Sequence, residues 1–185
     1  MKRVFILHGW GASPSDNWFP WLKMNLSSAG LQVTVPRMPD TSDPQPEAWV
    51  GLLSSLVGRP DEDTCLVGHS LGAMAILKYL ESEASGRIGL AVLVAPWPNL
   101  NSKKDSKYSK VAHRWMDAEP DWRRVKANAK RIAAIFSTTD PYVLVSNSEV
   151  YGAELDAKII IEENKGHIVQ ETAPTVLNSI FLFSK

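Results

Sequence analysis

A glycine-flanked serine at positions 68–72 constrains the fold of this chain more than any other stretch. Residues 64–67 are apolar enough for a buried strand, and residues 73–80 are typical of a helix. Between them lies Gly68-His69-Ser70-Leu71-Gly72, which is G-x-S-x-G in a strand–turn–helix context. So tight a turn requires strained backbone angles at the serine and leaves room only for glycine two positions to either side. The serine hydroxyl should then stand at a helix N-terminus, where developing negative charge is favoured.

A competing interpretation is a serine in an ordinary glycine-rich turn, which is common in loops. The strand before the motif and the helix after it argue against that interpretation, because Ala73 and Ala75 allow the helix to pack closely. The pattern therefore predicts a nucleophile elbow, the turn that presents a reactive serine.

Length and charge set limits on what the chain can be. Its 185 residues suffice for one domain with a substantial core, and a formal net charge of zero directs it to neither nucleic acid nor an anionic membrane. The single cysteine, Cys65, permits no intrachain disulfide and no cysteine cluster for zinc. The apolar run at 4–7 is too short for a signal peptide, and no stretch is long enough to span a bilayer. We therefore expect a cytoplasmic protein with neither a membrane nor a nucleic-acid partner.

Strand and helix patterns alternate along the chain. The predicted strands are 4–7, 31–35, 64–67, 90–94, 132–136 and 158–161. The predicted helices are 17–29, the apolar-periodic run ending at Gly58, 73–83, 122–129, 147–155 and a last one from Pro174. This order predicts a single α/β domain over residues 1–185, with three layers and about six parallel strands flanked by helices.

Residues 96–121 interrupt the alternation. This segment holds three prolines and a polar middle, with Trp97 and Trp115 near its two ends, and is interpreted as a small lid-like insertion. Its basic residues are Lys103, Lys104, Lys107, Lys110 and Arg114. Such a run is either a binding patch or a solvated face, and the zero net charge favours the solvated face.

The order of residues along the chain predicts three catalytic positions. A serine nucleophile needs a base and a third group that orients the base, in the order Ser, Asp or Glu, His on such a sheet. Of the four histidines only His167 follows an acid, Asp140, that itself follows Ser70 at a strand end. Asp140 could instead begin a turn at Pro141, and His167 could be an ordinary surface residue. Their position favours the catalytic roles, at the sheet edge where ligands bind.

Two backbone amides are candidates for an oxyanion hole. One is the amide of Leu71, directly after the nucleophile, and the other is that of Trp10, in the turn after the first strand. His8 and His69 are expected to pack or hydrogen-bond around these two turns, and His113 is expected to be exposed.

The sequence resembles the α/β-hydrolases, and more narrowly the small serine hydrolases of the YdeN and retinoblastoma-binding protein nine type. The motifs that carry the resemblance are Ile6-Leu7-His8-Gly9, Asn17-Trp18 with Trp21, 36–40, Val67-Gly68-His69-Ser70, Val94, Trp122 with Ala127-Asn128, Ser137-Thr138-Thr139-Asp140 and Gly166-His167. It implies a compact sheet without the two N-terminal strands of larger hydrolases, and Ser70, Asp140 and His167 as the triad.

The chain departs from its relatives' pattern in two places. Pro141 directly follows the acid, whereas many hydrolases place a Val-Pro or Leu-Pro shortly after it. The L-x-C-x-E peptide associated with binding to retinoblastoma-type pocket proteins is absent, since Asp63 and Val67 flank Cys65 at its first and last positions.

The expected function is that of a cofactor-independent serine hydrolase that cleaves small esters, with amides second, through an acyl-enzyme. No carboxylate stands at the elbow, as a haloalkane dehalogenase would need, and no clustered ligands suggest a metal site. Trp10, Trp97 and Trp115 are predicted to line the substrate pocket, while Trp21 and Trp49 are expected in the core. The alternative is a protein-binding module on a hydrolase scaffold with little turnover.

Overall fold

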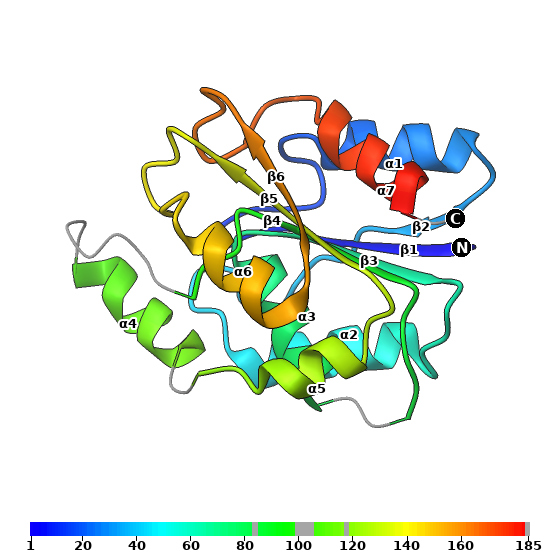
Figure 1. The fold of residues 1–185 in the computed structure, drawn as a ribbon, viewed down its shortest axis with the longest axis horizontal. Helices are drawn as coiled ribbons and strands as arrows, with labels where there is room; N and C mark the ends of the chain where they lie inside the picture. Colours follow the sequence, from blue (N-terminus) through cyan, green and yellow to red (C-terminus); the bar gives the residue numbers. More distant parts are fainter. Residues whose placement is uncertain (83–84, 99–105, 117–118, 184–185) are drawn as a thin grey trace.

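A computed structural model describes residues 1–82, 85–98, 106–116 and 119–183, and within them six strands form one sheet (Figure 1). The strands are β1 Arg3–Leu7, β2 Gln32–Thr34, β3 Thr64–His69, β4 Leu90–Val94, β5 Ile132–Ser137 and β6 Lys158–Glu162. Every neighbouring pair is parallel, and the order is β2-β1-β3-β4-β5-β6. The predicted α/β architecture is therefore confirmed.

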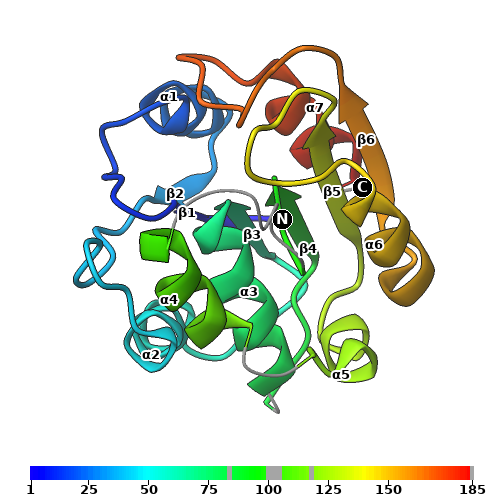
Figure 2. The same ribbon diagram turned by 90° about the vertical axis from the view of Figure 1, so that its left-hand side faces the viewer.

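Helices cover both faces of the sheet, as Figures 1 and 2 show. They are α1 Phe19–Ser28, α2 Pro46–Val57, α3 Leu71–Ser82, α4 Ser106–Trp115, α5 Trp122–Ala127, α6 Asn147–Leu155 and α7 Pro174–Phe183. Helices α1 and α7 pack on one face, and α2, α3, α5 and α6 pack on the other. None of the helices in these described ranges is both long and apolar enough to cross a membrane.

The apolar strands are explained by burial on both faces. Along β1, Phe5 and Leu7 point into the core under α2 and α3, whereas Val4 and Ile6 point into the core under α1 and α7. Alternate residues of a strand face opposite sides of the sheet, and so a strand covered on both sides is apolar throughout. Cys65 lies in the second of these cores, where burial raises the pKa of its thiol.

Element boundaries differ from the sequence prediction where tertiary context decides them. Strand β2 is shorter than predicted, because it lies at the edge of the sheet and pairs only with β1. Helix α4 was not predicted within the lid-like segment. Its residues Val111, Ala112 and Trp115 are buried at helical spacing, whereas His113 is exposed as expected. Residues 99–105, which include two of the basic residues, lie outside the described part of the chain.

Parallel strands bring their C-terminal ends to one edge of the sheet. Leu7 pairs with Gly68, His69 pairs with Val94, and Ser137 pairs with Glu162. The loops that carry Trp10, Ser70, Asp140 and His167 all leave this edge.

The turn between β3 and α3 has room only for glycine at its two flanking positions. A Cβ atom on Gly72 would lie 2.4 Å from the carbonyl oxygen of Leu7, and one on Gly68 would lie 2.6 Å from the amide nitrogen of Ala73. Real Cβ atoms do not approach backbone atoms so closely, and the neighbours belong to β1 and to α3 itself. The expected requirement for Gly68 and Gly72 is thereby confirmed.

We predict that Gly72→Ala lowers the free energy of unfolding by about 3 kcal/mol, because α3 must move away from β1 to admit the methyl group. Gly51→Ala is the matched control, since a Cβ atom there meets nothing within 4 Å. In the helix interior it should raise stability by about 0.5–1 kcal/mol. Urea unfolding measures both, and equal stability of the two variants would contradict the packing argument.

Candidate active site

Ser70 occupies the sharp turn at the centre of the sheet edge. Its backbone φ is 53°, which is the left-handed region that a non-glycine residue rarely adopts. The turn is fixed from both sides, because the amide of Ser70 donates to the Val94 carbonyl at 2.8 Å and its carbonyl accepts from Ala73 at 2.9 Å. The strained conformation predicted for this serine is confirmed, and its half-buried side chain faces a cavity.

Asp140 and His167 are joined by a hydrogen bond of 2.7 Å between Oδ2 and Nδ1. The other carboxylate oxygen of Asp140 accepts the backbone N–H groups of Tyr142 at 2.9 Å and Val143 at 3.0 Å. Asp140 therefore both shapes the turn at Pro141 and holds the imidazole, so the two interpretations of this residue are compatible. Because a carboxylate only accepts, Nδ1 of His167 carries a proton, and in the neutral imidazole Nε2 is therefore the acceptor.

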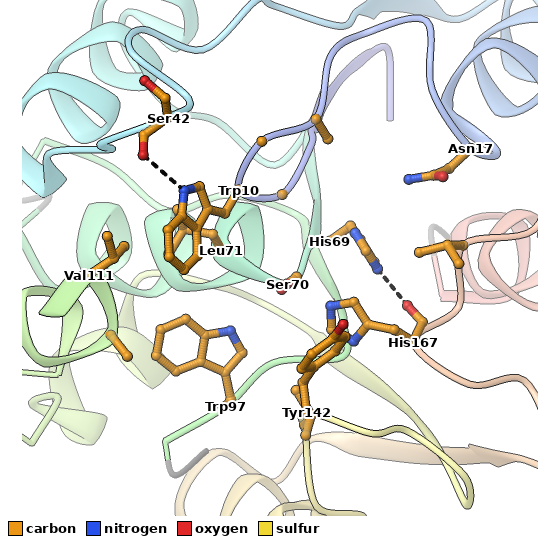
Figure 3. Close-up of a pocket in the computed structure, with 16 residues that line it drawn as sticks. Trp10, Asn17, Ser42, His69, Ser70, Leu71, Trp97, Val111, Tyr142 and His167 are labelled. Carbon is orange, nitrogen blue, oxygen red and sulfur yellow. Dashed lines mark hydrogen bonds between the residues drawn. The ribbon is translucent and has the colours of Figure 1, made fainter. Parts of the chain in front are cut away.

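The imidazole of His167 lies beside Ser70, as Figure 3 shows. Its side chain is 16 % exposed, whereas that of Asp140 is 1 % exposed. The ring of Tyr142 meets the imidazole edge to face with centroids 5.1 Å apart, and the ring of His69 lies 4.9 Å away on another side. The structure thus brings the three predicted side chains together at one end of a cavity.

The turn after β1 lies directly against the turn at Ser70. A Cβ atom on Gly9 would lie 3.3 Å from that of Ser70. The turn is held by buried His8, whose Nδ1 donates to the Gly9 carbonyl at 3.0 Å while Nε2 accepts from Met38 at 3.1 Å. Leu71 begins α3, and an amide in the first turn of a helix has no acceptor within the helix.

The cavity at Ser70 has a volume of about 520 Å³ and a largely apolar wall. Trp10 and Trp97 line it as predicted, and both indoles lie on the opposite side of Ser70 from His167 (Figure 3). The prediction missed further lining residues: Asn17, Ser42, Val111, Ala112, Tyr142, Val143 and Val169. Of these, Tyr142 had a sequence signal, since it stands two residues after Asp140.

Trp115 does not line this cavity, contrary to prediction. Its side chain is buried, its Nε1 donates to the Pro44 carbonyl at 3.0 Å, and its ring meets that of Trp49 edge to face. Trp115 instead packs α4 on the core, together with Val111 and Ala112. Trp49 is buried as expected, and Trp21 is half-buried against the core under α1.

His69 is the buried partner of the loop that carries His167. Its Nε2 donates to the carbonyl of His167 at 2.8 Å, and burial lowers the pKa of His69 to about 3. The ring is therefore neutral. The sequence placed it around the turn at Ser70 but did not indicate this bond to a residue 98 positions away.

No metal site is evident in the part of the chain that the structure describes. There, no three side chains among His, Cys, Asp and Glu are grouped to hold an ion.

Comparison with known proteins decides the family. The model of the family described as "Serine hydrolase" matches residues 4–180. This chain belongs to that family. It is a hydrolase, and its fold is that of the α/β-hydrolase class.

Two relatives illustrate the range of this serine hydrolase family. YdeN of Bacillus subtilis is 31 % identical over 181 residues, which cover 97 % of this chain and 93 % of YdeN. Its crystal structure matches with a TM-score of 0.89, covering 99 % of this chain and 98 % of that one. The serine hydrolase RBBP9 of Rattus norvegicus is 25 % identical over 162 residues, which cover 86 % of this chain and 82 % of RBBP9.

We predict that His69 makes folding of this serine hydrolase sensitive to acid. Below about pH 6.5 the unfolded chain takes up a proton at His69 that the folded protein, with a pKa of about 3 there, does not. Stability should fall as the pH falls, with His69 accounting for about 2 kcal/mol between pH 6.5 and pH 5.

His69→Gln provides the comparison, because its amide can reach the position of Nε2 and does not titrate. Urea unfolding at the two pH values should show a smaller acid loss in the variant. An identical loss in both proteins would contradict a neutral, buried His69.

Proposed function

We propose that this serine hydrolase cleaves small esters, with amides as slower substrates, through an acyl-enzyme. The observation that carries the proposal is the 2.7 Å bond between Asp140 and His167 at the cavity where Ser70 stands in its left-handed turn. This is the set of groups that activates a serine hydroxyl in acyl transfer.

In the proposed mechanism, the Oγ atom of Ser70 attacks the carbonyl carbon while Nε2 of His167 takes the hydroxyl proton. Asp140 keeps Nδ1 protonated and stabilises the imidazolium that forms. The imidazolium then gives its proton to the leaving group, and an acyl ester on Ser70 remains. Water, activated by the same imidazole, releases the acid and restores the serine.

The proposed oxyanion hole consists of the amides of Leu71 and Trp10. Both belong to turns that meet at Ser70, and the α3 N-terminus adds partial positive charge there. Such fixed donors stabilise the tetrahedral intermediate without reorganisation, and each typically contributes about 3 kcal/mol to lowering the barrier.

The cavity wall supports small, neutral substrates. Among its described lining residues there is no Lys, Arg, Asp or Glu, and the indoles of Trp10 and Trp97 form much of its apolar side. A charged acyl group would lose its hydration there without gaining a partner. Val111 and Ala112 of α4 also line the cavity, which supports the proposal that the segment around 96–121 acts as a small lid.

Replacing Ser70 tests the proposal directly. Ser70→Ala should lower kcat for a p-nitrophenyl ester by about 10,000-fold or more, because no nucleophile remains. It should also abolish labelling by a fluorophosphonate, read as added mass on the intact protein. Ser27→Ala, at an exposed position on α1, should keep both. Wild-type turnover in Ser70→Ala would refute the mechanism, and a wild-type protein that never labels would favour a binding module instead.

Trp97 is predicted to limit the size of the acyl group. Trp97→Ala removes an indole from the wall, and the ratio of kcat/KM for an octanoate ester to that for a butyrate ester should rise about tenfold. Trp115→Phe, outside the cavity, should leave the ratio unchanged. A ratio that moves with Trp115 but not with Trp97 would contradict the assigned pocket.

A further inference from the structure

The loop that carries His167 has an unusual backbone. Asn164, Gly166 and Ile168 have φ values of 56°, 54° and 54°. For Ile168 this conformation is costly, because a β-branched side chain crowds the backbone in the left-handed region. Strain of this kind persists only when surrounding contacts over-determine it, and such positions cluster at functional sites.

One side of the loop is held by hydroxyl groups at the end of β5. Ser137 accepts the amide of Lys165 at 3.0 Å, Thr138 accepts that of Asn164 at 3.1 Å, and Thr139 accepts that of Gly166 at 3.2 Å. These bonds fix the approach to His167 from the sheet edge that also carries Asp140. They do not reach the two residues after Gly166.

The other side is held by two buried side chains, one just before α1 and one at the C-terminal end of β3. Nε1 of Trp18 donates to the carbonyl of Ile168 at 2.9 Å, and Nε2 of His69 donates to the carbonyl of His167 at 2.8 Å. Trp18 is 0 % exposed and His69 is 3 % exposed. The two rings meet edge to face with centroids 6.0 Å apart, and so they form one unit.

The side chain of His69 makes no hydrogen bond to its own turn. Its Nδ1 is buried and has no hydrogen-bond partner among the described residues, so its single bond is the one to the His167 loop. A buried imidazole with one unpaired nitrogen is less favourable than a phenyl ring of similar shape, unless the remaining bond matters. That bond ends on the backbone of His167 itself.

We propose that Trp18 and His69 are positioning residues, which hold two consecutive carbonyls so that the imidazole of His167 stays fixed between Asp140 and Ser70. This inference rests on the proposed function for the role of His167. If either donor is lost, a carbonyl is left buried without a partner, and the strained conformation of Ile168 is held less firmly, by the remaining donor and by the bond from its amide to the Lys165 carbonyl at 3.0 Å. Rotation there would carry the adjacent imidazole away from Ser70, and a small displacement of a catalytic group costs rate rather than substrate binding.

The experiment compares four variants of the full chain. Trp18→Phe and His69→Phe remove one donor each and keep an aromatic ring in place. His69→Gln keeps a donor near Nε2, and Trp49→Phe is the matched control, because it removes a buried indole bond to the Pro39 carbonyl on the other face of the sheet.

Hydrogen exchange of the peptide spanning residues 163–170, read by mass spectrometry, reports the loop without requiring activity. Exchange should speed up at least tenfold in Trp18→Phe and His69→Phe but stay at the wild-type rate in Trp49→Phe. For a p-nitrophenyl ester, the first two variants should lose tenfold or more in kcat with KM within twofold, and His69→Gln should recover most of that loss.

Unchanged exchange of this peptide in Trp18→Phe, or an equal acceleration in Trp49→Phe, would overturn the positioning role. So would a loss confined to KM. Failure of the proposed function would be recognised differently: the wild type would show no ester turnover, or Ser70→Ala would retain it. The exchange rates would in that case still show whether Trp18 and His69 hold the loop.

Discussion

The turn at Ser70 is possible only because three backbone segments meet without side chains between them. Ser70 takes a φ of 53°, and Gly72 brings α3 into contact with the last carbonyls of β1. The same approach sets the turn of Gly9 and Trp10 beside Ser70. Everything else at the candidate site is arranged relative to this fixed point, which is why glycines stand where these segments approach one another: Gly68 at the end of β3, Gly72 at the start of α3 and Gly9 in the turn after β1.

Three of the four histidines lie at or near the cavity, and they divide into two kinds. His8 and His69 are buried, and burial lowers the pKa of each. His8 hydrogen-bonds the backbone of the turn after β1, and His69 hydrogen-bonds the backbone of the loop that carries His167. His167 alone is partly exposed and has a carboxylate partner. The first two imidazoles serve as rigid hydrogen-bonding parts of the scaffold, whereas His167 is the one to which the proposed mechanism assigns proton transfer.

Sequence patterns predicted the sheet well because each inner strand is covered by helices on both faces and is therefore a continuous run of apolar residues. They also predicted the meeting of Ser70, Asp140 and His167, since parallel topology brings the three loops to one edge. They did not predict α4, because its few apolar residues stand among prolines and charged residues. They also misplaced Trp115, whose indole donates a hydrogen bond to the Pro44 carbonyl. The bonds from Trp18 and His69 to the His167 loop span 150 and 98 residues, and no local pattern encodes contacts of that range.

The central claim is that one hydroxyl, one imidazole and one carboxylate act together around Ser70. A crystal structure of the protein after reaction with a phosphonate ester tests it most directly. The account predicts phosphorus bonded to Oγ of Ser70, with a phosphoryl oxygen about 2.7–3.1 Å from the amides of Leu71 and Trp10 and His167 still bonded to Asp140. An adduct on another residue, or a phosphoryl oxygen turned away from both amides, would contradict it.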